Sequence, residues 1–125
     1  MKARRIISRV EELKRSRKKA HACLVKSGSR VYAKFLELEA AAYASRTLDR
    51  KTKLLIGTGI SVVLNCEGCM QWHIEEAAAA GATENELIET IEVAMKMGGG
   101  PAVVSSRLAL EVMDGLFEAK GGRAS

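Results

Sequence analysis

Two cysteines and a histidine lie close together near the middle of the chain, in the stretch Asn65-Cys66-Glu67-Gly68-Cys69-Met70-Gln71-Trp72-His73. At about 100° per residue of helix, Cys69 lies about 60° and His73 about 20° from Cys66, so the three side chains share one face. The first turn of a helix favours thiolates, because its free N–H groups and dipole are positive. Cys-x-x-Cys can close there into a disulfide, and His73 can take a thiol proton from Cys69. The stretch predicts a redox-active dithiol.

Other interpretations of this cluster remain open on the residues alone. Free cysteines are among the most buried residues, so the pair could belong to the core. A structural zinc site normally has four ligands, and only His21 and Cys23, on another predicted helix, could complete one. A c-type haem attachment needs histidine where Met70 stands, and a thioredoxin-like motif needs strands, which the sequence does not indicate. We favour the dithiol, and expect neither a metal nor a cofactor.

The first half of the chain predicts three helices. An amphipathic stripe from Ile6 to Leu24 is interrupted by Ser27-Gly28-Ser29, and a second stripe from Val31 ends near Ser45. Asp49 can cap the third helix. Its uncharged body, residues 54–64, is expected to be a buried core helix whose glycines let a neighbouring helix approach closely.

The second half predicts three more helices. The fourth begins at about Cys66 and stops at Gly81, a residue suited to the position after a helix. Thr83-Glu84-Asn85-Glu86 is a capping box for the fifth, which the glycine run 98–100 breaks. Pro101 suits the first turn of the sixth, which ends before residue 121. With one proline, few aromatics and many strong helix formers, the chain is expected to be all-α, with about six helices in one domain over residues 1–125.

Charge is unevenly distributed along the chain. Residues 1–30 hold eleven Lys or Arg against two acids, a balance of +9, whereas residues 31–125 hold nine against thirteen, a balance of −4. The basic helical segment, about residues 1–27, could neutralise phosphates. Aromatic residues for base stacking are nearly absent there, so we expect a solvated helix face rather than a nucleic-acid site. No stretch approaches the roughly 18 apolar residues of a membrane span, and no apolar segment typical of a secretory signal follows the basic start. We therefore expect a cytoplasmic protein without a membrane partner.

From about Leu48 to Gly115 the sequence resembles the alkylhydroperoxidase D-like, or carboxymuconolactone decarboxylase-like, proteins. The resemblance is carried in order by residues 48–53, by Cys66-x-x-Cys69-x-x-x-His73, by Gly81-Ala82-Thr83 and by the glycine run to Pro101. It implies an all-helical fold that assembles as homotrimers or homohexamers. It also implies dithiol peroxidase chemistry in the members that keep both cysteines.

The resemblance also implies a role for each residue of the motif. Cys69 would be the peroxidatic thiol, which attacks a hydroperoxide and becomes a sulfenic acid. Cys66 would resolve it as a disulfide, His73 would be the base, and a thiol or lipoyl reductant would restore the dithiol. By its place nearer the helix end, Cys66 should instead have the lower pKa. We follow the family assignment, because His73 is the i+4 neighbour of Cys69.

Two positions depart from the family pattern. Leu54 stands where peroxidase members carry a glutamate that extends the proton relay, and Gly68 stands where tyrosine is common. We expect slow or narrow peroxidase activity unless Glu67, Glu75 or Glu76 substitutes for the missing acid. The alternatives are a decarboxylase of a carboxymuconolactone-like acid, which needs no cysteine pair, and a family member with a binding or structural role.

Overall fold

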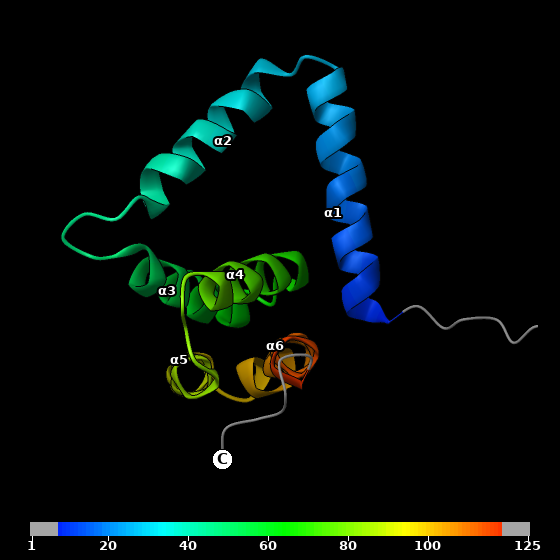
Figure 1. The fold of residues 1–125 in the computed structure, drawn as a ribbon. Coiled ribbons are helices and arrows are strands. Elements are labelled where there is room, and N and C mark those ends of the chain that lie inside the picture. The colour runs from blue at the N-terminus through cyan, green and yellow to red at the C-terminus, as the bar shows by residue number, and fades with distance from the viewer. Residues whose placement is uncertain (1–7, 119–125) are drawn as a thin grey trace, which may run out of the picture.

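The computed structural model describes residues 8–118, and over that range the chain forms six helices and no strand (Figure 1). The helices are α1 (Arg9–Lys26), α2 (Arg30–Tyr43), α3 (Arg50–Val63), α4 (Glu67–Ala79), α5 (Glu84–Gly98) and α6 (Gly100–Glu118). The all-α prediction and the number of helices are therefore confirmed. The expected start of the first helix at Ile6 and the chain after residue 118 lie outside the described residues. None of the helices in residues 8–118 has the length and apolar character needed to cross a membrane.

The predicted helix ends are set by local hydrogen bonds. The Asp49 carboxylate accepts a hydrogen bond of 2.8 Å from the N–H of Thr52 and so caps α3. Thr83 and Glu86 form the predicted capping box, with reciprocal hydrogen bonds of 2.9 and 3.1 Å. Gly81 follows α4 with a φ of 100°, a left-handed conformation that glycine adopts without the penalty of a Cβ. Gly81 thus marks the end of α4, the helix of the cysteines, and the two caps mark the starts of α3 and α5.

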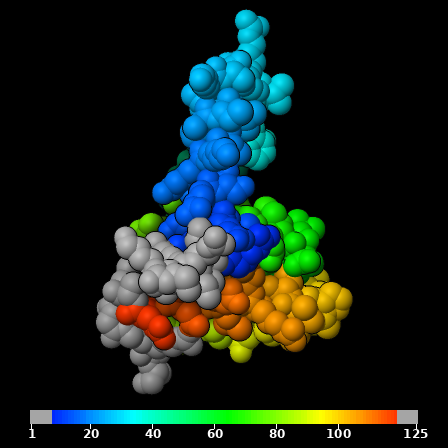
Figure 2. All heavy atoms as spheres, turned by 90° about the vertical axis from the view of Figure 1, so that its right-hand side faces the viewer, coloured from blue at the N-terminus to red at the C-terminus, as the bar shows by residue number. Residues whose placement is uncertain are grey.

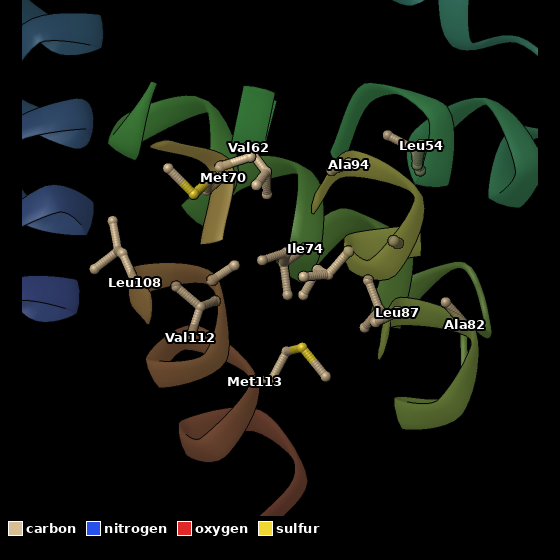
Figure 3. Packing of buried hydrophobic residues seen from close by; sticks show 14 residues of the cluster. Leu54, Val62, Met70, Ile74, Ala82, Leu87, Ala94, Leu108, Val112 and Met113 are labelled. Carbon is tan, nitrogen blue, oxygen red and sulfur yellow. The ribbon is translucent and has the colours of Figure 1, made fainter. Parts of the chain in front are cut away.

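The hydrophobic core lies among the last four helices, α3 to α6 (Figure 3). α3 packs against α4 and α5, and α6 packs against the same two helices. Their inner faces carry the largest buried apolar side chains, which are Leu54, Val62, Met70, Ile74, Leu87, Ile91, Leu108, Val112 and Met113. The core holds α4 in place and leaves its amino-terminal end, with the cysteines, near the surface.

The expectation of a buried core helix over residues 54–64 is correct for one face of α3 and wrong for the other. Only one face is buried, through Leu54, Thr58, Ser61 and Val62. The opposite side is open, and Ile60 is 54% exposed. The reason is that α4, α5 and α6 cover α3 from one side, while α2 leads away from it instead of covering the other (Figure 1).

Helices α1 and α2 form an arm, residues 9–43, that projects from the four-helix body (Figures 1 and 2). Neither helix has a single buried residue. At its base α1 is tied to α4, where Arg9 and Glu67 form an ion pair of 2.6 Å. The apolar stripe of α2 faces no other part of residues 8–118, and Val31 at its start is 82% exposed.

Candidate functional site

The two cysteines lie at the amino-terminal end of α4, as predicted, and they are joined by a disulfide bond. Cys66 is the N-cap residue and Cys69 lies in the first turn. Asn65 has a φ of 54°, and this left-handed turn leads the chain directly from α3 into α4. Both cysteines are half-buried, so they are not part of the core. A reagent or a partner thiol can therefore reach them.

The sulfur of Cys66 takes the place of a capping oxygen. The N–H of Cys69 donates a hydrogen bond of 3.3 Å to Cys66 Sγ. The sulfur thereby satisfies one of the N–H groups that the first turn of a helix leaves unpaired. A hydrogen bond to sulfur at the positive end of the helix dipole stabilises a thiolate at Cys66.

His73 lies one turn after Cys69 on the same helix, and each of its ring nitrogens has a hydrogen-bond partner. Nδ1 lies 2.7 Å from the carbonyl oxygen of Cys69, and Nε2 lies 2.6 Å from the hydroxyl of Tyr43. A carbonyl oxygen can only accept, so Nδ1 carries the ring proton and donates it. Nε2 is then the acceptor, and the Tyr43 hydroxyl donates to it. None of the hydrogen bonds among residues 8–118 joins His73 to a sulfur in this disulfide form.

Aromatic rings surround the imidazole. Trp72 meets His73 edge-on with ring centroids 4.9 Å apart, and Tyr43 does so at 5.5 Å. The Tyr43 and Trp72 rings are also in contact, with centroids 5.9 Å apart. Burial, followed by the nearby charge of Glu39, raises the pKa of Tyr43 above its usual value. The Tyr43 hydroxyl therefore stays protonated near neutral pH and remains a donor.

Gly57 gives this group the space that it occupies. A Cβ at this position of α3 would lie 2.5 Å from His73 Cδ2 and 2.8 Å from both His73 Nε2 and the Tyr43 hydroxyl. Ordinary contacts between carbon atoms are about 3.5–4.0 Å, so any side chain here would displace the pair. The expected close approach at the α3 glycines is thus made at Gly57 by the rings of His73 and Tyr43.

No carboxylate replaces the relay glutamate in the hydrogen bonds of residues 8–118. Leu54 is fully buried in the core, so its position is dry and apolar. The three candidate acids bind basic side chains instead: Glu67 pairs with Arg9 at 2.6 Å, Glu75 with Lys14 at 3.7 Å and Glu76 with Arg50 at 3.0 Å. Gly68 has open space around its Cα. The polar partner of His73 is Tyr43.

Sequence reasoning missed Tyr43 and Gly57 as site residues. Tyr43 precedes His73 by thirty residues and ends a different helix. A glycine within the apolar body of α3 was the one visible signal, and it indicated close packing without saying against what. The other candidate zinc ligands, His21 and Cys23, do not join the cysteine pair. Both lie exposed on α1. In the part of the chain that the structure describes, no three His, Cys, Asp or Glu side chains gather as a metal site.

Comparison with known proteins places the fold and the motif in a family. Residues 29–112 match the carboxymuconolactone decarboxylase family. A crystal structure of a family member from Legionella pneumophila superimposes with a TM-score of 0.81 at 31% identity, covering 85% of this chain and 95% of that one. A Thermotoga maritima family member, for which a part in the antioxidative response has been suggested, superimposes with a TM-score of 0.78 at 28% identity, covering 87% and 92%.

Sequence relatives agree with the structural ones. Uncharacterized protein 4 in the cox locus of Paracoccus denitrificans is 34% identical over 89 residues, which are 71% of this chain and 80% of that protein. An uncharacterized protein of Cupriavidus necator is 32% identical over 76 residues, 61% of this chain and 67% of its own. The chain belongs to the carboxymuconolactone decarboxylase family.

Proposed function

We propose that this protein is a thiol-dependent peroxidase that reduces hydroperoxides through the Cys66–Cys69 pair. The observation that carries the proposal is the Cys66–Cys69 disulfide in the first turn of α4, with the His73 imidazole one turn away. A pair that can be oxidised in place, is open to reagents and lies at a helix end has the features of a catalytic dithiol. The suggested antioxidative part of the Thermotoga maritima relative supports the same reading.

The reaction balances as two thiols and one hydroperoxide giving a disulfide, an alcohol and water. The Cys69 thiolate attacks the hydroperoxide, the O–O bond breaks, and the sulfur is oxidised to a sulfenic acid while the alkoxide takes a proton. The Cys66 sulfur then attacks the sulfenic sulfur and releases water. His73 accepts and returns the thiol proton. A small thiol or a lipoyl group reduces the disulfide and completes the cycle.

The test counts free thiols in reduced, metal-stripped protein before and after brief treatment with an organic hydroperoxide. The chain has three cysteines, so the count should fall from three to one, and the mass of the chain should fall by two hydrogens. The Cys23→Ser variant is the control, since its count should fall from two to zero. A count that stays at three would refute the proposal. Carbon dioxide release from 4-carboxymuconolactone would then favour the decarboxylase reading.

The role of His73 in thiol oxidation is tested by comparing its replacement with that of His21. Replacing His73 with alanine should slow thiol oxidation by at least about 100-fold, the usual lower limit for general acid–base catalysis. Replacing His21, which lies exposed on the arm, should leave the rate unchanged. Oxidation that is as fast in His73→Ala as in the wild type would rule out His73 as the base.

We also propose that the protein assembles with copies of itself, the α2 helix of one copy lying on α3 and α5 of another. Between α3 and α5 lies an open apolar groove of about 550 Å³, lined by side chains that include Leu55, Ile56, Ile60, Val93 and Met97. The same chain carries an uncovered helix with apolar side chains at positions 31, 35 and 38. This spacing is the one by which an amphipathic helix binds a groove.

Sedimentation tests the assembly. Phe35→Glu on α2 and Ile60→Glu in the groove should each reduce the mass to that of the monomer, because a charge in an apolar interface costs several kcal/mol. Val103→Glu, a change at an exposed apolar residue of α6 outside the groove, is the control. A wild-type monomer, or assemblies that survive both changes, would contradict this arrangement.

A further inference from the structure

We propose that Tyr43 is a positioning residue of the dithiol site, which holds His73 at Nε2 and replaces the missing carboxylate of the relay. As far as it concerns turnover, this inference rests on the proposed peroxidase function. It starts from the 2.6 Å hydrogen bond between the Tyr43 hydroxyl and His73 Nε2, which joins the last residue of α2 to α4.

The two hydrogen bonds of His73 give its ring nitrogens different roles, so that Nδ1 is a donor and Nε2 is the possible base. Nδ1 already carries a proton, because it donates to the carbonyl of Cys69 at 2.7 Å. A further proton can therefore be taken up only at Nε2. Tyr43 is bound at that nitrogen, so it controls the one ring atom that can act as a base.

A hydroxyl suits this position in a way that a carboxylate does not. When His73 is neutral, the Tyr43 hydroxyl donates to Nε2, and when the ring is protonated the same oxygen accepts from Nε2–H. A carboxylate can only accept, so it would favour the protonated ring and raise its pKa. With a tyrosine the imidazole keeps a partner in both states, so Nε2 can take up a proton without losing its hydrogen bond. The buried, apolar Leu54 offers no such partner.

The end of α2 is fixed to α3 although the rest of the arm is exposed. The Lys53 ammonium donates a hydrogen bond of 2.7 Å to the carbonyl of Ala44, the residue directly after Tyr43. The N–H of Arg50 donates one of 2.8 Å to the Ser45 hydroxyl. Gly57 leaves room for the phenol and the imidazole to meet over α3. Tyr43 is thus held beside His73 by hydrogen bonds that tie the two residues directly after it, Ala44 and Ser45, to α3.

The experiment compares Tyr43→Phe with Tyr32→Phe. Tyr32 is a matched control, because its hydroxyl also binds a histidine, His21, but on the arm and away from the cysteines. Long-range proton–nitrogen NMR spectra of the disulfide form report the tautomer of the two histidines, and the His21→Gln variant assigns them. The reduced form is then followed as a function of pH by alkylation of its thiols and by oxidation with an organic hydroperoxide.

We expect His73 to keep its proton on Nδ1 in the wild type and in Tyr43→Phe, because the Cys69 carbonyl still accepts from Nδ1, and we expect the Nε2 nitrogen signal to shift in Tyr43→Phe, because Nε2 loses its donor. Tyr43→Phe should also slow thiol oxidation by about tenfold or more and change its pH profile, whereas Tyr32→Phe changes none of these for His73. A spectrum of His73 and a pH profile that are unaltered in Tyr43→Phe would overturn the inference. A rate change without a change in the Nε2 signal or the pH profile would also overturn it, since loss of packing alone would explain that result.

Failure of the peroxidase proposal can be told apart from failure of this inference. If the wild type consumes no hydroperoxide, the Nε2 nitrogen signal of His73 and the pH dependence of alkylation still decide the role of Tyr43. A changed Nε2 signal together with a changed alkylation profile supports Tyr43 as the partner of His73 even then. Both unchanged refutes it even in an active enzyme. Thermal unfolding of each variant confirms that the fold is intact.

Discussion

Replacing Gly57 with alanine tests the packing of the site at a single atom. The new Cβ would lie 2.5 Å from His73 Cδ2, about 1 Å closer than two carbon atoms normally approach. It would also lie 2.8 Å from His73 Nε2 and from the Tyr43 hydroxyl. His73 or α3 must move, and the hydrogen bond between Tyr43 and His73 should lengthen or break.

Gly59 provides a matched control two residues further along α3. Alanine at either site gains about 0.8–1 kcal/mol of helix propensity over glycine. At Gly59 the added Cβ would meet only Thr90, with Cγ2 at 3.4 Å, so little has to move. At Gly57 overpacking costs about 1–3 kcal/mol and the weakened hydrogen bond about 0.5–1.5 kcal/mol. The difference between the two variants should therefore be about 1.5–4.5 kcal/mol, with Gly57→Ala the less stable.

Urea unfolding of the disulfide form, at one fixed protein concentration, measures this difference. Because Gly59 lines the apolar groove, sedimentation must first show the same assembly state for both variants. In the His73→Ala background the penalty of Gly57→Ala should shrink, since the atom that it meets first is gone. Equal stability of Gly57→Ala and Gly59→Ala would refute the packing argument, as would a penalty that does not shrink when the imidazole is removed.

Two further predictions concern stability away from the cysteines. Gln71 is fully buried, and neither atom of its amide has a hydrogen-bond partner within residues 8–118, so Gln71→Met should stabilise the fold by about 1–3 kcal/mol in the same urea assay. A loss of stability would instead mean that a bound water satisfies the amide. Thr52 lowers the pKa of Asp49, and the Thr83 N–H lowers that of Glu86, so both contribute stability above their unfolded pKa values of about 3.9 and 4.3. That contribution should be lost as the pH falls through the lower pKa values of the folded state. The free energy of unfolding should therefore fall less steeply at acid pH in the double variant Asp49→Ala with Glu86→Ala than in the wild type, and equally steep curves would contradict the prediction.

The features that could be predicted from the sequence depend on residues close together in the chain. The capping box needs only Thr83 and Glu86, and the cysteine pair needs only the spacing of a first helical turn. Tyr43 could not be found in this way, since its contact with His73 arises when the end of α2 returns to α3. Which side of α3 stays exposed could not be predicted for a related reason. A run of apolar residues predicts that a surface is shielded from water, but not whether the same chain or another one covers that surface.

The His73 imidazole and the amino-terminal end of α4 would act on the cysteines in different halves of the proposed cycle, the imidazole in oxidation and the helix end in reduction. His73 is bound to the backbone of Cys69 and would serve the oxidation of that thiol, in which a proton must be taken up and returned. The helix end and the N–H of Cys69 instead stabilise negative charge on Cys66. In reduction, an incoming thiolate attacks one sulfur and expels the other, and the sulfur with the lower pKa leaves faster. Cys66 is then the better leaving group, so a reductant should attack Cys69. The lower pKa expected for Cys66 and the peroxidatic role proposed for Cys69 are therefore compatible.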